Sequence, residues 1–96
     1  MATAIKVINM ETLWVDFQNA GKDGVRLICK GTLDGVSEKG LTLYDGLQLI
    51  IWTEDQDDDG KPDNLVVNAV IKYSATDDCW VGQFNMDDLK NESQIK

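Results

Sequence analysis

The sequence predicts an all-β protein, a small five-stranded antiparallel barrel or strongly bent sheet. Apolar and β-branched residues gather in short runs, and turns rich in glycine, asparagine and aspartate separate them. No segment combines the length of a helix with a 3.6-residue apolar period. An SH3-like barrel is preferred over an OB-like one, because the OB fold carries a helix between its strands and no such helix is predicted.

Five runs have the alternation or the apolar content expected of strands. In the first run, for example, Leu13, Val15 and Phe17 alternate with residues of the opposite face. A longer connection over residues 33–46 allows one helical turn before Gly40, which would end it. The predicted strands are residues 12–18, 25–32, 47–52, 65–73 and 79–84, with a further short strand over 5–8.

One domain accounts for the 96 residues, because two cores would each be too small. We expect this domain to span residues 5–90, with disordered ends at 1–4 and 91–96. Asn85 is a good cap for a single helical turn that follows the last strand. Two cysteines within predicted strands and no CxxC motif indicate reduced thiols.

The two most apolar strands, residues 47–52 and 65–73, flank an acidic loop over residues 54–64 and should form a β-hairpin. The loop matches the pattern Asp-x-Asp-x-Asp-Gly-x-x-Asp. It resembles the first half of an EF-hand loop and the calcium repeats of thrombospondin type 3. By that resemblance the cation ligands are Asp55, Asp57, Asp59, the backbone carbonyl of Lys61, and Asp63.

The loop departs from the EF-hand pattern at its last position, where Val66 replaces the bidentate glutamate. Fewer oxygens remain than the roughly six to eight that calcium takes, so a dissociation constant on the order of 10⁻⁴–10⁻³ M is expected. In an up-and-down topology, Asp23, Asp87 and Asp88 would approach the same end of the sheet and add ligands. The alternative is a solvated loop without a cation, since aspartate and glycine are ordinary turn residues.

Both central strands are apolar on their two faces. If one face fills the core, the other presents Ile50, Trp52, Val66 and Val70 on neighbouring strands. An apolar cluster with a tryptophan is typical of a partner site. Alternatively, residues 5–8 or 86–89 cover the cluster, or residues 5–8 of a second subunit do so in a homodimer.

Charge and composition exclude several classes of function. A net charge of −8, with nine scattered Lys and Arg, argues against binding to nucleic acid or to anionic membranes. The chain has no histidine, no phosphate-binding glycine motif and no apolar run long enough to span a membrane. We therefore expect a cytoplasmic, non-enzymatic module without a cofactor that binds a protein or itself, with weak calcium binding as the alternative.

Five short motifs stand out along the chain, at residues 13–17, 25–27, 31–33, 40–47 and 79–81. Together they resemble a set of uncharacterised short bacterial proteins, which we expect to be all-β and SH3-like. The resemblance implies a small β domain in a bacterium, and it implies no activity and no site residues.

Overall fold

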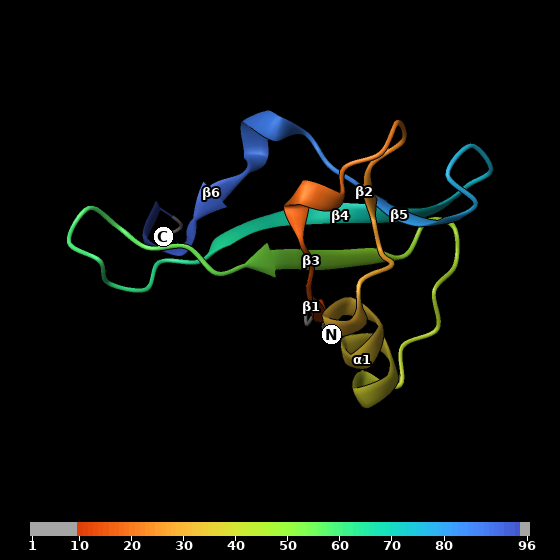
Figure 1. Ribbon diagram of the computed structural model, residues 1–96, viewed down its shortest axis with the longest axis horizontal. Coiled ribbons are helices and arrows are strands. Elements are labelled where there is room, and N and C mark those ends of the chain that lie inside the picture. Colours follow the sequence, from red (N-terminus) through yellow and green to blue (C-terminus); the bar gives the residue numbers. More distant parts are fainter. Residues whose placement is uncertain (1–9, 95–96) are drawn as a thin grey trace, which may run out of the picture.

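The computed structural model describes residues 10–94, so the strand predicted over 5–8 and the end predicted over 1–4 lie outside it. The described part measures 41 × 40 × 27 Å. It consists mainly of strands, with one short α-helix beside the sheet (Figure 1). The prediction of a mainly β protein is therefore confirmed.

The sheet is an open path of strands in the order β1-β3-β4-β5-β2. At one edge β1 (Thr12–Trp14) runs parallel to β3 (Gln48–Thr53). The remaining neighbours are antiparallel, through β4 (Leu65–Ser74) and β5 (Cys79–Gln83) to β2 (Val25–Arg26) at the other edge. Of the two predicted forms, the barrel is wrong, because β1 and β2 do not pair and the sheet stays open. The predicted all-antiparallel pairing is also wrong, because a helix-containing crossover joins β1 to β3 and makes that pair parallel.

One hydrophobic core lies against the concave side of this sheet. Buried residues of β1 and of the segment after it pack in the same cluster as Val25 and Leu27, although β1 and β2 are opposite edges of the sheet. The sheet must therefore bend strongly. Both of its edges contribute to one core, whose buried residues are Leu13, Val15, Val25, Leu27, Leu49, Ile51, Val67, Ala69 and Ile71.

The helix α1 (Lys30–Lys39) occupies residues for which the sequence predicted the end of a strand and at most one helical turn. Its two internal glycines lower helix propensity and conceal it from a periodicity search. They also let α1 approach β1 closely: a Cβ on Gly31 would lie 2.8 Å from Trp14 Cζ3, and one on Gly35 would lie 3.0 Å from Leu13 Cδ1. Helix formation here depends on tertiary packing.

The predicted stop of this helix is confirmed, since Gly40 adopts the left-handed conformation at φ 64° and caps the last turn. At the other end Cys29 precedes the helix instead of lying in a strand. The buried Thr32 hydroxyl donates a 2.9 Å hydrogen bond to the carbonyl of Trp14. This bond ties the first turn of α1 to the outer edge of β1.

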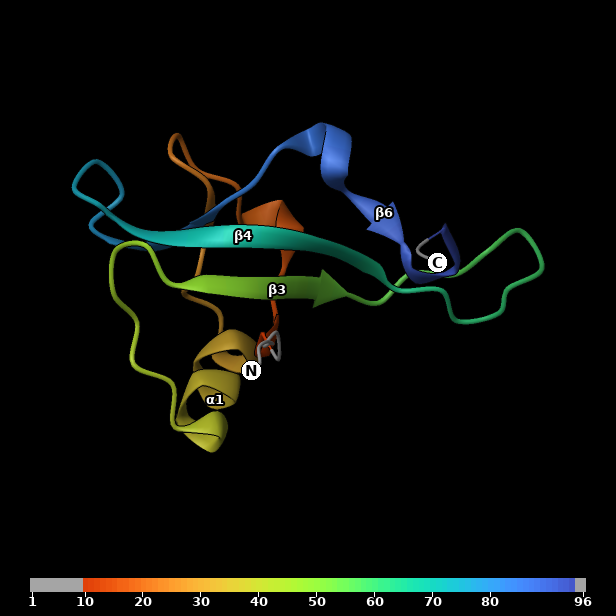
Figure 2. The same ribbon diagram turned by 180° about the vertical axis from the view of Figure 1, so that it is seen from behind.

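The hairpin of β3 and β4 is confirmed, with Thr53 opposite Leu65 and residues 54–64 as its loop. That loop projects from one end of the sheet in both ribbon views (Figures 1 and 2). The short 3₁₀ helix η3 (Met86–Asp88) has the predicted cap, because the Asn85 side chain accepts the Asp87 amide.

After η3 the chain returns to β4 and forms the short strand β6 (Lys90–Asn91), which pairs with the first two residues of β4. The 3₁₀ helix η4 (Glu92–Gln94) follows. The sequence predicted a disordered tail from residue 91. In the structure residues 91–94 instead lie beside the acidic loop (Figure 2). Side-chain hydrogen bonds to that loop hold them there, and a polar composition alone does not reveal such bonds.

Candidate functional site

The face of the sheet turned away from the core carries a groove. Paired residues of neighbouring strands lie on the same face of a sheet, and Trp52 is paired with Val66. Ile50, two residues before Trp52 on β3, therefore lies with them on the face away from the core. These three side chains are half-buried and line a groove of about 980 Å³. The sequence predicted all three as an apolar cluster.

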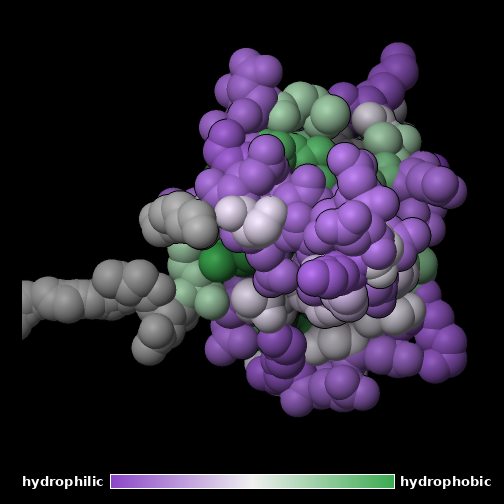
Figure 3. Space-filling view, turned by 90° about the vertical axis from the view of Figure 1, so that its left-hand side faces the viewer, coloured by the Kyte–Doolittle hydropathy of each residue, from purple (hydrophilic) through white to green (hydrophobic). Residues whose placement is uncertain are grey.

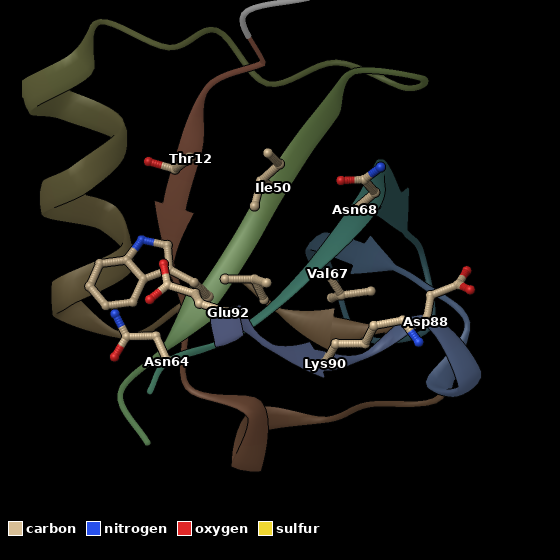
Figure 4. Close-up of a pocket in the computed structure, with 10 residues that line it drawn as sticks. Thr12, Ile50, Asn64, Val67, Asn68, Asp88, Lys90 and Glu92 are labelled. Atoms are coloured by element: carbon tan, nitrogen blue, oxygen red, sulfur yellow. The ribbon is translucent and has the colours of Figure 1, made fainter. Parts of the chain in front are cut away.

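Polar residues surround this apolar floor. Thr12 of β1 and Asn68 of β4 flank Ile50, as Figure 4 shows. Asp88 and Lys90 lie on the far side of β4, where η3 and β6 approach the sheet (Figure 4). An apolar floor with a polar rim is the usual anatomy of a protein-binding surface. The full lining is Thr12, Ile50, Trp52, Asn64, Val66, Val67, Asn68, Asp88, Lys90 and Glu92.

Val70, the fourth predicted member of the cluster, lies on the same strand face but outside the groove. It is 39% exposed and is paired with Gln48 and Gln83. The prediction that residues 86–89 cover the cluster is not met by the described side chains. Met86 is 68% exposed, and Leu89 packs against the core cluster instead.

The acidic loop is wound by its own hydrogen bonds. One carboxylate oxygen of Asp57, Oδ1, accepts the amides of Asp59 and Lys61, each at 2.9 Å. The Asp57 amide in turn donates to the Lys61 carbonyl, which the sequence predicted as a cation ligand. Gly60 takes a positive φ of 82°, as the predicted tight turn requires.

The other predicted carboxylates face the C-terminal segment. Asp55 Oδ2 accepts the Asn91 amide at 2.9 Å, and the carboxylate of Asp63 accepts both the amide and the hydroxyl of Ser93. Four of the five predicted ligands, namely Asp55, Asp57, the Lys61 carbonyl and Asp63, are therefore engaged by separate partners. Within residues 10–94, no group of three or more potential metal ligands is assembled.

The additional ligands proposed from an up-and-down topology do not gather at the loop. Asp23 accepts a 2.6 Å hydrogen bond from Ser74, the last residue of β4, whereas the loop leads into Leu65, its first. A ten-residue strand spans roughly 30 Å, so Asp23 lies at the opposite end of the sheet. Asp88 lines the groove.

Hydrogen bonding lowers the pKa of two carboxyls at this end of the sheet. The Trp14 indole donates to Glu54 at 2.7 Å and lowers the pKa of Glu54. The Asn91 amide does the same for the pKa of Asp55. Both groups are therefore held as carboxylates.

Hydrophilic residues dominate the surface at the end of the sheet where the acidic loop projects, and apolar residues show only in smaller areas around it (Figure 3).

Sequence reasoning missed the polar members of the groove, above all Asn68, Lys90 and Glu92. Asn68 is the single polar residue in the middle of an apolar strand, and this interruption was an available signal. Lys90 and Glu92 gave no signal, because they reach the groove only through the pairing of β6 with β4.

Comparisons with protein-family models, with curated proteins and with solved structures give no match. Of the described residues, no helix is long and apolar enough to cross a membrane.

Proposed function

We propose that this chain is a non-enzymatic interaction module that binds an apolar segment of a protein partner in the groove. The observation that carries the proposal is the convergence of Ile50, Trp52 and Val66 from two adjacent strands on the face away from the core. That face needs no apolar residues for folding, because the core lies on the other side. Apolar clusters in such positions mark interaction sites.

The tryptophan is the expected centre of the binding energy. Tryptophan is enriched among interface residues whose truncation costs at least about 2 kcal/mol, which corresponds to roughly thirtyfold weaker binding. Trp52 is half-buried by its neighbours in the free chain, so a partner would complete its desolvation. The surrounding polar groups would then form the rim of the interface.

The test is the variant Trp52→Ala, with Tyr44→Ala as its matched control. Tyr44 is a 55% exposed aromatic residue that does not line the groove. A chain that carries a photo-crosslinking residue in place of Thr12 identifies the partner. Analytical ultracentrifugation over a range of protein concentrations detects self-association. We expect Trp52→Ala to lose association while remaining folded and Tyr44→Ala to retain it. Equal association of both variants would refute the proposal.

The second candidate is weak calcium binding by the acidic loop. The observation in its favour is that Asp57 and Gly60 already wind the loop as a calcium loop requires. Calcium would have to displace Asn91 and Ser93 from Asp55 and Asp63. We expect saturable amide shifts at residues 55–63 with a dissociation constant on the order of 10⁻³ M, lost in Asp59→Asn. Shifts that follow ionic strength alone would contradict it.

An SH3-like architecture also stays a prediction. Its support is the strong bend that brings β1 and β2 onto one core. An experimental structure with defined positions for residues 1–9 tests it, because an additional strand between these edges would be needed to close the sheet.

A further inference from the structure

We propose that residues 5–8 of the same chain occupy the groove as an internal ligand that a partner must displace. The inference rests on the proposed function, since it names the competitor for the same surface. It stands on three observations: where the described chain begins, the chemistry of the segment and the groove, and an open hydrogen-bonding position on β4.

The described chain begins next to the groove. Met10 leads directly into β1, whose first residue, Thr12, lines the groove and pairs with Ile50. Four residue steps separate Ile8 from Thr12, and an extended chain covers at most about 14 Å in four steps. Ile50 is the immediate neighbour of Thr12, and its amide donates to the Glu11 carbonyl at 2.9 Å, so the segment before Met10 is tethered within reach of the floor.

The segment and the groove are chemically complementary. Ile5, Val7 and Ile8 are apolar and match the floor of Ile50, Trp52 and Val66. Lys6 is the only charged side chain among the first nine residues. The rim carries the carboxylates of Asp88 and Glu92 and the one ammonium group of Lys90, so it has an excess of one negative charge, opposite in sign to Lys6.

The floor also offers a free backbone position. The backbone groups of Ile71 bond the segment before β3, so Ile71 directs them to the β3 side of β4. Because this direction alternates along a strand, the even-numbered residues of β4 direct their backbone groups to the side of β5 and β6. On that side β5 pairs from Val70 onward and β6 pairs at Val66. Asn68 lies between them. Within residues 10–94 its backbone has no partner there, and an extended segment can supply one.

Binding within one chain is favoured over exchange between two copies. A short tether gives the segment an effective concentration in the millimolar range at its own groove, on the order of 10⁻³ M. Association of two chains that each carry a net charge of −8 is opposed by repulsion at low ionic strength.

The experiment compares full-length chains by NMR at several protein concentrations. The variant Ile5→Ser/Val7→Ser removes the apolar contacts, and Ala2→Ser/Ala4→Ser is the matched control. We expect the first variant alone to shift the amides of Val66 and Asn68 and the indole resonance of Trp52. Hydrogen exchange of the backbone amides at residues 6–8 with solvent should be about tenfold slower in the parent chain than in this variant, at every protein concentration.

Identical groove resonances in the parent chain and in Ile5→Ser/Val7→Ser would overturn the inference. Shifts that grow with protein concentration would also overturn it, because they assign the groove to a second copy. The proposed function is tested separately by Trp52→Ala. If that variant loses its partner while the two serine variants behave alike, the inference fails and the proposed function stands.

Discussion

Replacing Gly31 by alanine tests whether close packing of α1 on β1 organises this edge of the sheet. The new Cβ would lie 2.8 Å from Cζ3 of Trp14, closer than such atoms approach in proteins, and 3.0 Å from Cε3. The Trp14 ring is rigid and its indole is tied to Glu54 by a 2.7 Å hydrogen bond, so either the ring or the helix must move.

Two opposing terms determine the size of the effect. Forcing a methyl group into a packed site costs about 1–3 kcal/mol. Alanine gains at most about 1 kcal/mol over glycine in a helix interior, and less at the second helical position, where Gly31 lies. We therefore expect Gly31→Ala to lower the free energy of unfolding by about 1–2 kcal/mol, a fall in Tm of roughly 4–16 °C for a domain of this size.

Gly35→Ala is the matched control in the same helix. Its Cβ would lie 3.0 Å from Leu13 Cδ1, the end of a flexible side chain that can rotate away. The propensity gain of up to about 1 kcal/mol should then offset the strain and leave stability nearly unchanged. Urea denaturation followed by circular dichroism measures both variants. A Gly31→Ala chain as stable as the Gly35→Ala chain would refute the packing argument.

Two further predictions concern the core and the acidic loop. Ile51→Ala removes a fully buried side chain and should cost about 2–5 kcal/mol in urea denaturation, whereas a loss below about 1 kcal/mol would place Ile51 outside the core. Asn91→Ala should return the pKa of Asp55 toward its ordinary value in an NMR titration, because the Asn91 hydrogen bond is the largest cause of the lowered pKa. The stabilisation by this bond is complete above the ordinary pKa of Asp55 and is lost as pH falls through the lowered one, so the stability difference between the parent and Asn91→Ala should narrow at low pH. The part that remains there belongs to the 2.7 Å hydrogen bond from Asn91 to the Asp63 carbonyl, which does not titrate. An unchanged Asp55 titration would contradict this account.

The central hairpin was predictable from the sequence because its signals are local. Two apolar runs of strand length flank a loop of aspartate and glycine, and turn chemistry of this kind acts over a few residues. The same locality explains the confirmed caps at Gly40 and Asn85, where a single residue satisfies neighbouring backbone groups. Three of the four predicted cluster residues share a groove because alternation along a strand fixes the face.

The helix and the parallel pair were not predictable, because tertiary contacts determine both. Alone, a segment containing Gly31 and Gly35 favours no helix, and its stability comes from the surface of β1. Without that helix the topology defaults to successive hairpins. Such a topology would have placed Asp23 beside the acidic loop, whereas in the structure it bonds Ser74 at the far end of β4.

The segment after Leu89 connects the two candidate sites, because successive side chains along β6 and the start of η4 face the groove and the loop in turn. Lys90 and Glu92 line the groove, while Asn91 and Ser93 bond the carboxylates of Asp55 and Asp63. Only two residues of β6 pair with β4, so few backbone hydrogen bonds hold this segment in place. A ligand that displaced Lys90 or Glu92 would also strain the bonds to the loop, and a cation that captured Asp55 and Asp63 would release one wall of the groove. We therefore predict that the groove and the loop are coupled, and amide shifts at Val66 in a calcium titration would reveal that coupling.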